Sequence, residues 1–302
     1  MNIKLLAPSL WEDYELIDSG NFEKLERFGR CVTARPEPQA LWNKSLSDGE
    51  WKERADAYFV RDKRSEERGE WVCKPRTPEQ WFVEYRYKEL EMRMRLGLTS
   101  FKHVGIFPEQ AENWNFIYDS VSALKNDSPH QPIKILNLFA YTGGASLAAR
   151  GAGAEVTHVD SVKQTVTWSR ENMEASAMDG IRWIVEDALK FVRREVKRGN
   201  RYHGIILDPP AYGRGAEGER WILEENLGEM LALCGELLGA APGCFLVLNL
   251  YSMGLSALLA QTATRQLVLK NTAPAAEEIG ELYFSDSFGK SLPLGVYYRF
   301  TR

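Results

Sequence analysis

The sequence has few residues of the kinds that build metal sites or disulfide frameworks. Its 302 residues include four cysteines, Cys31, Cys73, Cys234 and Cys244, none of them in C-x-x-C spacing, and four scattered histidines. We therefore expect no metal site and no disulfide framework. This cysteine usage fits a protein of the reducing cytoplasm.

Signals for export or membrane insertion are also weak. The first residues, MNIKLLAPSLWEDYEL, lack a charged segment followed by an apolar one, so we expect no signal peptide. Residues 237–264 carry no charge, but they include Pro242, Gly243 and Asn249. A buried strand, CFLVLNL, followed by a helix, MGLSALLAQTA, explains this stretch better than a membrane span.

Net charge gives little support for general binding to nucleic acid, because the chain carries −4 at neutral pH. The charge is uneven, however. Residues 52–102 hold thirteen Lys and Arg against ten Asp and Glu, and residues 190–201 hold six against one. The second run is either the solvated face of an amphipathic helix or a patch that contacts phosphates.

The first hundred residues differ in texture from the rest. They are rich in Trp and Tyr and contain short alternating runs separated by Gly, Pro and Asp, which is typical of antiparallel strands and turns. Residues 81–97 read as a strand that runs into a charged segment. We predict a small β-rich domain at 1–100, which could bind substrate, and a second domain at 101–302.

From Ile133 onward, strand and helix patterns alternate. Strands are expected at 133–138, 155–160, 181–186, 203–208 and 244–250, with helical patterns between them. The tail, 281–302, reads as two strands joined by a turn. Repeated strand–helix units predict an α/β fold, a Rossmann-like and mostly parallel sheet closed by an antiparallel strand at the C-terminus.

The first strand–helix turn points to a nucleoside ligand. It reads Tyr141-Thr142-Gly143-Gly144, which is not the three-glycine dinucleotide fingerprint. Glycines let a ligand approach the backbone, and the free N–H groups of a helix N-terminus can bind a pyrophosphate or a carboxylate. Asp160 ends the second strand, where an acid can bind ribose hydroxyls or can simply cap a helix.

Two later acids follow the third and fourth strands. Asp187 can reach an adenine amino group from the same sheet edge. Asp208-Pro209-Pro210 forms a rigid turn without N–H donors, which can present a carboxylate and a carbonyl to an amino group. In isolation such a turn is an ordinary loop, but here it comes after three matching strand ends.

These motifs resemble those of class I S-adenosylmethionine-dependent methyltransferases. The runs NLFAYTGG, VTHVD, VEDA and LDPPAYGRG are most similar to the group that includes ribosomal RNA large-subunit methyltransferase I, and the resemblance covers about the last 200 residues. Residues 100–116 resemble the segment before the first strand in that group, in which a Phe-acid-Gln element packs on the cofactor; a linker with a buried Phe is the alternative.

The resemblance implies S-adenosyl-L-methionine as the cofactor and a set of site residues. Its cofactor contacts would come from Phe107, Glu109, Gln110, Phe139, Tyr141, Thr142, Gly143, Gly144, Asp160, Ser161, Asp187, Ala188 and Asp208. Asp160 would hold the ribose, and Asp187 with Ala188 the adenine. Asp208, Pro209 and Tyr212 would be the catalytic residues.

Two departures from the group bear on which atom is methylated. Members that methylate carbon-5 of cytosine need a cysteine after the fifth strand, where this chain has Asn249-Leu250-Tyr251-Ser252. Ala211 also separates Pro210 from Tyr212, whereas amino-group methyltransferases often have an aromatic directly after the prolines. The resemblance favours methylation of an RNA base, ribosomal RNA above others, and the missing cysteine favours a nitrogen as the target atom. A protein or small-molecule substrate, or cofactor binding without turnover, are the alternatives.

Overall fold

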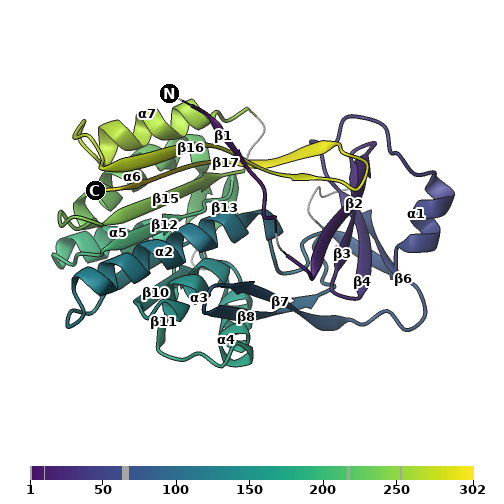
Figure 1. Cartoon of the computed structure of the whole chain (residues 1–302), viewed down its shortest axis with the longest axis horizontal. Coiled ribbons are helices and arrows are strands. Elements are labelled where there is room, and N and C mark those ends of the chain that lie inside the picture. Colours follow the sequence, from purple (N-terminus) through teal and green to yellow (C-terminus); the bar gives the residue numbers. More distant parts are fainter. Residues whose placement is uncertain (1, 10, 63–67, 216–217, 252–253) are drawn as a thin grey trace.

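An eight-stranded mixed sheet dominates the computed structural model, which describes residues 2–9, 11–62, 68–215, 218–251 and 254–302. The strand order is β1-β16-β17-β15-β12-β9-β10-β11, and only β17 runs against its neighbours (Figure 1). The strands are β1 (Lys4–Leu6), β9 (Lys134–Leu138), β10 (Glu155–Asp160), β11 (Ile181–Val185), β12 (Gly204–Leu207), β15 (Phe245–Leu250), β16 (Ala276–Ser285) and β17 (Ser291–Thr301).

Helices cover both faces of this sheet, as the apolar strands predicted. One core cluster joins the sheet to α2 (Ala111–Asp127), α3 (Gly144–Gly151) and α4 (Lys163–Ala175). The other joins it to α5 (Ala188–Lys197), α6 (Leu223–Leu237) and α7 (Ala257–Leu267). The predicted fold class, with its antiparallel strand near the C-terminus, is confirmed, and the five parallel strands β9, β10, β11, β12 and β15 each lie within one residue of their expected bounds.

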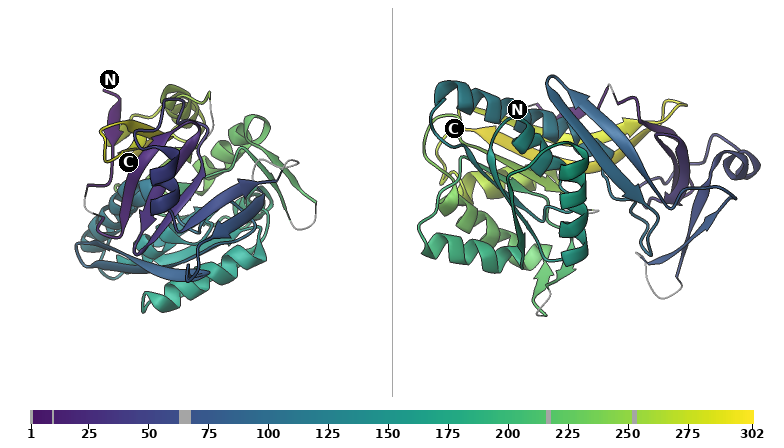
Figure 2. Two further views of the ribbon diagram at one scale, coloured as in Figure 1. Left: turned by 90° about the vertical axis from the view of Figure 1, so that its right-hand side faces the viewer. Right: turned by 90° about the horizontal axis from the view of Figure 1, so that it is seen from below.

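The N-terminal residues form a second, five-stranded sheet in the order β2-β3-β4-β5-β6. Its elements are β2 (Tyr14–Gly20), β3 (Glu23–Phe28), β4 (Cys31–Pro36), α1 (Asp48–Arg54), β5 (Ala57–Arg61) and β6 (Gly69–Cys73). Figure 2 shows this sheet beside the larger one. Its buried Trp11, Tyr14 and Phe28 belong to the same core cluster as α2 and α3, so the two parts pack against each other.

A hairpin of β7 (Gln80–Tyr87) and β8 (Leu90–Gly97) connects the two parts. We expected a charged segment in its second half, and the structure has a strand there instead. Met92, Met94 and Leu96 are buried and alternate with Arg93 and Arg95, which is the period of two of a half-buried strand. Although β8 lies before residue 100, it packs on α3 and α4 of the predicted second domain. The domain boundary at residue 100 therefore stays a proposal.

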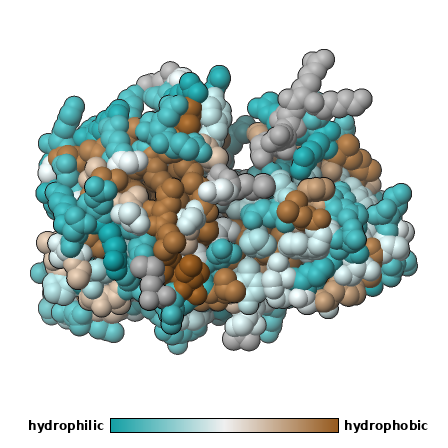
Figure 3. Space-filling model, turned by 90° about the horizontal axis from the view of Figure 1, so that it is seen from above, coloured by the Kyte–Doolittle hydropathy of each residue, from teal (hydrophilic) through white to brown (hydrophobic). Residues whose placement is uncertain are grey.

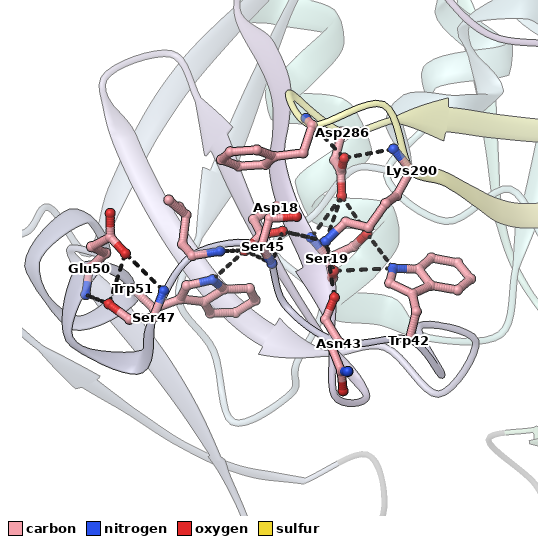
Figure 4. A network of polar contacts seen from close by, with 12 residues as sticks. Asp18, Ser19, Trp42, Asn43, Ser45, Ser47, Glu50, Trp51, Asp286 and Lys290 are labelled. Carbon is pink, nitrogen blue, oxygen red and sulfur yellow. Dashed lines mark hydrogen bonds and ion pairs between the residues drawn. The ribbon is translucent and has the colours of Figure 1, made fainter.

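The β16–β17 hairpin reaches from the large sheet into the N-terminal part (Figures 1 and 2). At its turn, the Lys290 ammonium donates to Asp18 Oδ1 over 2.7 Å and to the Ser19 carbonyl over 2.6 Å (Figure 4). Asp18 is fully buried and also accepts from the Trp51 indole N–H over 2.8 Å. This ion pair joins the N-terminal sheet to the far end of the chain.

The side on which β1 and α7 lie carries an apolar strip (Figure 3). Exposed apolar side chains on these two elements are Leu5, Leu258 and Leu259. Among the described residues, no helix is both long and apolar enough to cross a membrane.

Candidate active site

The turn between β9 and α3 has an unusual backbone. Phe139, Tyr141 and Gly143 all have positive φ angles, of 55°, 48° and 93°. Such angles are costly for residues with a side chain and collect at functional sites. Gly143 is the N-cap of α3 and makes no side-chain cap, so the first N–H groups of the helix are available to a ligand.

Neighbouring elements hold this turn in place. The Thr142 hydroxyl donates to the Gly105 carbonyl over 2.6 Å, and the Asn172 amide on α4 donates to the Thr142 carbonyl over 2.9 Å. A Cβ atom at Gly144 would lie only 2.6 Å from the Trp114 ring, so the backbone rests directly on this indole. Glycine is required there because any side chain would displace the turn or the ring.

A chain of buried, hydrogen-bonded side chains runs from Asn137 to the Tyr141 carbonyl and supports the turn. The Asn137 amide donates to Ser146 Oγ over 2.9 Å, and Ser146 Oγ lies 3.0 Å from His158 Nδ1. His158 Nε2 lies 3.3 Å from Ser169 Oγ, which donates to the Tyr141 carbonyl over 2.6 Å. Burial lowers the pKa of His158 to about 3. A neutral imidazole with its proton on Nε2 satisfies every member of this chain.

Asp160 ends β10 directly beside the turn. Its carboxylate accepts from the Tyr141 N–H and from the Val162 N–H, each over 2.9 Å. Burial raises the pKa of Asp160 to about 6, although both backbone hydrogen bonds lower it. Two carboxylate oxygens offer about four acceptor positions, so Asp160 can still accept from a ligand.

Asp208 follows β12, next to Asn249 at the end of the neighbouring strand β15. The Asn249 amide donates to Asp208 Oδ1 over 2.7 Å. Burial raises the pKa of Asp208 to about 6, and the hydrogen bond from Asn249 opposes this rise. The hydrogen bond from Asn249 favours the ionised carboxylate and holds it in one orientation.

The residues after Asp208 form a short hairpin of β13 (Tyr212–Arg214) and β14 (Arg220–Ile222). The Trp221 indole donates to the Pro210 carbonyl over 2.7 Å and packs on the Phe139 ring, with 4.7 Å between ring centroids. The proline turn is thus anchored to the glycine turn. Tyr212 is 51% exposed, and its hydroxyl accepts from Arg214 Nε over 2.8 Å.

A cavity lies between the glycine turn, α2 and the ends of β12 and β15. Of the predicted residues, it is lined by Phe107, Gln110, Phe139, Tyr141, Thr142, Gly143, Gly144 and Asp208. The Phe107 ring packs against Tyr141, with 5.3 Å between their centroids. The structure therefore brings together residues as far apart in the sequence as Phe107 and Asp208.

Other predicted residues lie outside the lining of this cavity. Asp160 and Ser161 follow β10 at the side of the turn, and Asp187 caps α5 by accepting from the Lys190 N–H over 2.8 Å. Ala188, the first residue of α5, is buried. The role of these residues in holding the cofactor stays a prediction.

Glu109 faces the N-terminal sheet. It is buried, and burial raises its pKa to about 7, against the opposing charges of Lys24 and Arg35. Its predicted contact with the cofactor also stays untested.

The basic run at 190–201 is largely paired within the protein. Arg193 binds Glu229 and Arg194 binds Glu186, in both cases through two hydrogen bonds, and Arg198 binds Glu195. The buried Phe191 and Val192 face the core. This arrangement favours the solvated face of an amphipathic helix over a phosphate-contacting patch.

The four cysteines are free thiols, and none of them lines the cavity. Cys234 and Cys244 are fully buried, and burial raises the pKa of both thiols. Within the described ranges, no group of three or more His, Cys, Asp and Glu side chains could hold a metal ion.

Among the residues of the cavity wall that sequence reasoning missed are Met94 on β8, Trp114 on α2 and Asn249 on β15. Asn249 carried a readable signal, because a polar residue near the end of the apolar run FLVLNL is unusual. Met94 and Trp114 had none, since only the tertiary packing brings the hairpin and α2 against the glycine turn.

The site fits the S-adenosylmethionine that the sequence resemblance implies. The glycine turn leaves backbone N–H groups open at the start of α3, and Asp160 adds an acid beside it. Asn249 Oδ1 is a buried acceptor without a partner among the described residues, and its side chain lines the cavity. A ligand with a carboxylate, an ammonium and a ribose can use all three features.

Comparison with known proteins supports this interpretation. A crystal structure of an S-adenosylmethionine-dependent methyltransferase from Agrobacterium tumefaciens is 37% identical in sequence, with a TM-score of 0.87. The match covers 99% of this chain and 93% of that one. A second structure, of a methyltransferase complexed with S-adenosylhomocysteine, is 15% identical with a TM-score of 0.68, and this likeness concerns the fold alone.

Curated relatives match over a shorter part of their length. Ribosomal RNA large subunit methyltransferase I of Aeromonas salmonicida is 27% identical over 70% of this chain and 51% of its own length. Methyltransferase K/L of Shewanella frigidimarina is 29% identical over 49% of this chain. This chain therefore spans about half of the first relative and 20% of the second. No family model matches. On the full-length match to the Agrobacterium protein, the chain belongs to the S-adenosylmethionine-dependent methyltransferases.

Proposed function

We propose that this methyltransferase acts on a base of RNA, with ribosomal RNA favoured, and that its target is an amino nitrogen. The observation that carries the proposal is the Asp208-Pro209-Pro210 turn, whose acid lines the cavity beside the glycine turn and is held by Asn249. An ionised carboxylate and a proline carbonyl are two acceptors that suit an amino group with two N–H donors. The curated relatives, which are named as ribosomal RNA methyltransferases, support RNA as the substrate.

In this proposal, the chain contributes mainly positioning. Asp208 and the Pro209 carbonyl accept hydrogen bonds from the target amino group and aim its lone pair at the cavity. The exposed ring of Tyr212 stacks on the base after the base has left its own stack. The bound cofactor supplies an electrophilic methyl group on a sulfonium. Methyl transfer to the nitrogen would leave S-adenosylhomocysteine and displace one proton, which Asp208, as the acceptor of that N–H group, would take.

A covalent route through carbon-5 of a pyrimidine is disfavoured. It needs a thiol next to the base, and no cysteine lines the cavity among the described residues. Asn249, Leu250 and Tyr251 occupy the stretch where the resembled enzymes carry that cysteine; Ser252 lies outside the described residues.

The N-terminal sheet would help to hold the RNA. The Tyr251 hydroxyl, just after β15, donates to Glu37 Oε1 over 2.8 Å, so the N-terminal part borders the edge at which Asp208 lies. Two features favour action in the cytoplasm: the proposed RNA substrate, and the four cysteines, which are free thiols as expected in a reducing compartment. A protein or a small molecule is the alternative substrate.

Single-turnover methyl transfer with saturating cofactor tests the site. The RNA is taken from cells that lack the protein, and nucleoside mass spectrometry identifies the product. Asp208→Asn replaces an acceptor by a donor that faces the amino group, so it should lower the maximal rate by roughly 10²-fold or more. Tyr212→Ala should cost about 1–3 kcal/mol in substrate use, the value of base–aromatic stacking, and should leave cofactor affinity nearly intact.

A matched control is Phe288→Ala, which removes an aromatic ring of similar exposure, 49%, from the turn between β16 and β17. Transfer at the wild-type rate by both Asp208→Asn and Tyr212→Ala would mean that the proline turn is only a loop. Methylation of protein or small molecules with none of RNA would replace the proposed substrate.

A further inference from the structure

The side chain of Asn249 is only half satisfied. It is 3% exposed, and its Nδ2 donates to Asp208 Oδ1 over 2.7 Å, while its Oδ1 has no hydrogen-bond partner among the described residues. Buried amide oxygens are nearly always paired in folded proteins, because an unpaired one costs free energy. The unpaired oxygen therefore points to a donor other than those that the described residues supply.

The orientation of this amide is dictated by its neighbour. With the amide reversed, Oδ1 would face the Asp208 carboxylate, and two acceptors would repel each other. Oδ1 is thus the free atom. On its side of the amide stands Gly295, with a φ of 148°, and a Cβ atom there would lie 3.5 Å from Oδ1. That distance is an ordinary van der Waals contact, so the positive φ, and not the space beside Oδ1, favours glycine at this position.

The cavity that Asn249 lines has two ends of opposite character. At one end, α3 begins with Gly143 and Gly144, where free N–H groups favour an anion. At the other end, Asp208 and Asn249 line the cavity, and the carboxylate together with the buried Oδ1 of Asn249 are acceptors that favour a cation with several N–H donors. The amino-acid end of S-adenosylmethionine carries a carboxylate and an ammonium on one carbon, and so matches both ends.

We propose that Asn249 is a positioning residue that binds the ammonium of the cofactor through Oδ1 and orients Asp208 through Nδ2. One amide then links cofactor binding to the orientation of the Asp208 carboxylate. Cofactor binding fixes the amide, and the fixed amide holds the carboxylate that receives the target amino group. This inference rests on the proposed roles of the cofactor and of Asp208.

Calorimetry with two ligands tests the ammonium contact without any turnover. S-adenosylhomocysteine carries the amino-acid group, and 5′-methylthioadenosine keeps the adenosine and sulfur but lacks that group. Asn249→Ala should weaken the binding of S-adenosylhomocysteine about tenfold or more, as expected for a hydrogen bond to a charged group. It should change the affinity for 5′-methylthioadenosine less than about twofold.

Asn115→Ala is a matched control, because it removes a part-buried amide that binds Tyr85 over 2.7 Å and does not line this cavity. It should leave the affinity for both ligands unchanged. If Asn249→Ala does not fold, Asn249→Ser gives the same comparison with a smaller change in polarity. In the methyl-transfer assay, Asn249→Ala should raise KM for the cofactor and also lower kcat, since Asp208 loses its donor.

Three results would overturn the inference. Equal loss of both ligands would show that Asn249 maintains the pocket as a whole. Unchanged binding of both would show that water satisfies Oδ1. A higher KM with an unchanged kcat would break the proposed link to Asp208. Failure of the wild type to bind either ligand would instead refute the cofactor site itself, and a failure to methylate RNA would leave the binding comparison intact.

Discussion

Asp160→Ala is the sharpest test of how this protein holds its cofactor. The Asp160 carboxylate accepts from the Tyr141 and Val162 N–H groups, each over 2.9 Å, and it lies at the end of β10, where a ribose is expected. Alanine removes the acceptors for the ribose hydroxyls. It also leaves two backbone donors without their partner, which loosens the turn in which Tyr141 has a φ of 48°.

The size of the effect follows from the charge of the acceptor. Hydrogen bonds to charged groups contribute about 1.5–3 kcal/mol, so affinity for S-adenosylmethionine should fall roughly ten- to 150-fold. Asp160→Asn keeps the shape and one acceptor oxygen, and should fall between Asp160→Ala and the wild type.

Calorimetry on the purified variants measures the loss, and thermal unfolding confirms that each variant is folded. Asp179→Ala is the control, because this acid belongs to an exposed pair with Arg150 and its side chain is 90% exposed. Unchanged affinity in Asp160→Ala would refute the assignment. Tighter binding of NAD than of S-adenosylmethionine by the wild type would refute it as well.

Three further predictions concern the thiols, a buried acid and the joint between the two parts. A variant with all four cysteines changed to Ser or Ala should still transfer methyl groups without a covalent RNA adduct; lost transfer with intact cofactor binding would reveal a required thiol. Glu109→Gln should raise the free energy of unfolding at pH 8 by about 3 kcal/mol and change it little at pH 4, as denaturant titrations at both pH values can measure. Burial raises the pKa of Glu109 to about 7, so the protonated carboxyl favours the folded state at low pH, and this contribution is lost as pH rises. Equal effects of the substitution at both pH values would contradict this prediction. Asp18→Ala should destabilise the protein by about 3–5 kcal/mol because it removes a fully buried carboxylate that pairs with Lys290 and accepts from the Trp51 indole and the Leu46 N–H (Figure 4), whereas loss of the exposed Arg86–Glu84 pair should cost no more than about 1 kcal/mol; similar denaturation midpoints for the two variants would refute this.

Local sequence patterns predicted the five parallel strands from Lys134 to Leu250 and the helices between them, but not the short hairpin of β13 and β14. Apolar runs such as GIIL at 204–207 and FLVLNL at 245–250 are readable because strand and helix periods are local properties. The glycine turn, Asp160 and Asp208 could be assigned to one sheet edge for a similar reason. Parallel strands joined by helices necessarily bring their carboxyl ends to the same side.

The surroundings of these residues depend on tertiary packing. Nothing local in the sequence says that Met94 closes the cavity, that Asn249 holds Asp208, or that Glu109 is buried near Lys24 and Arg35. Such contacts join segments that are tens to hundreds of positions apart, and their energies depend on burial. The same carboxyl group is an ordinary acid in water, but it has a pKa of about 6 in the pocket of Asp208, because the fold removes it from solvent.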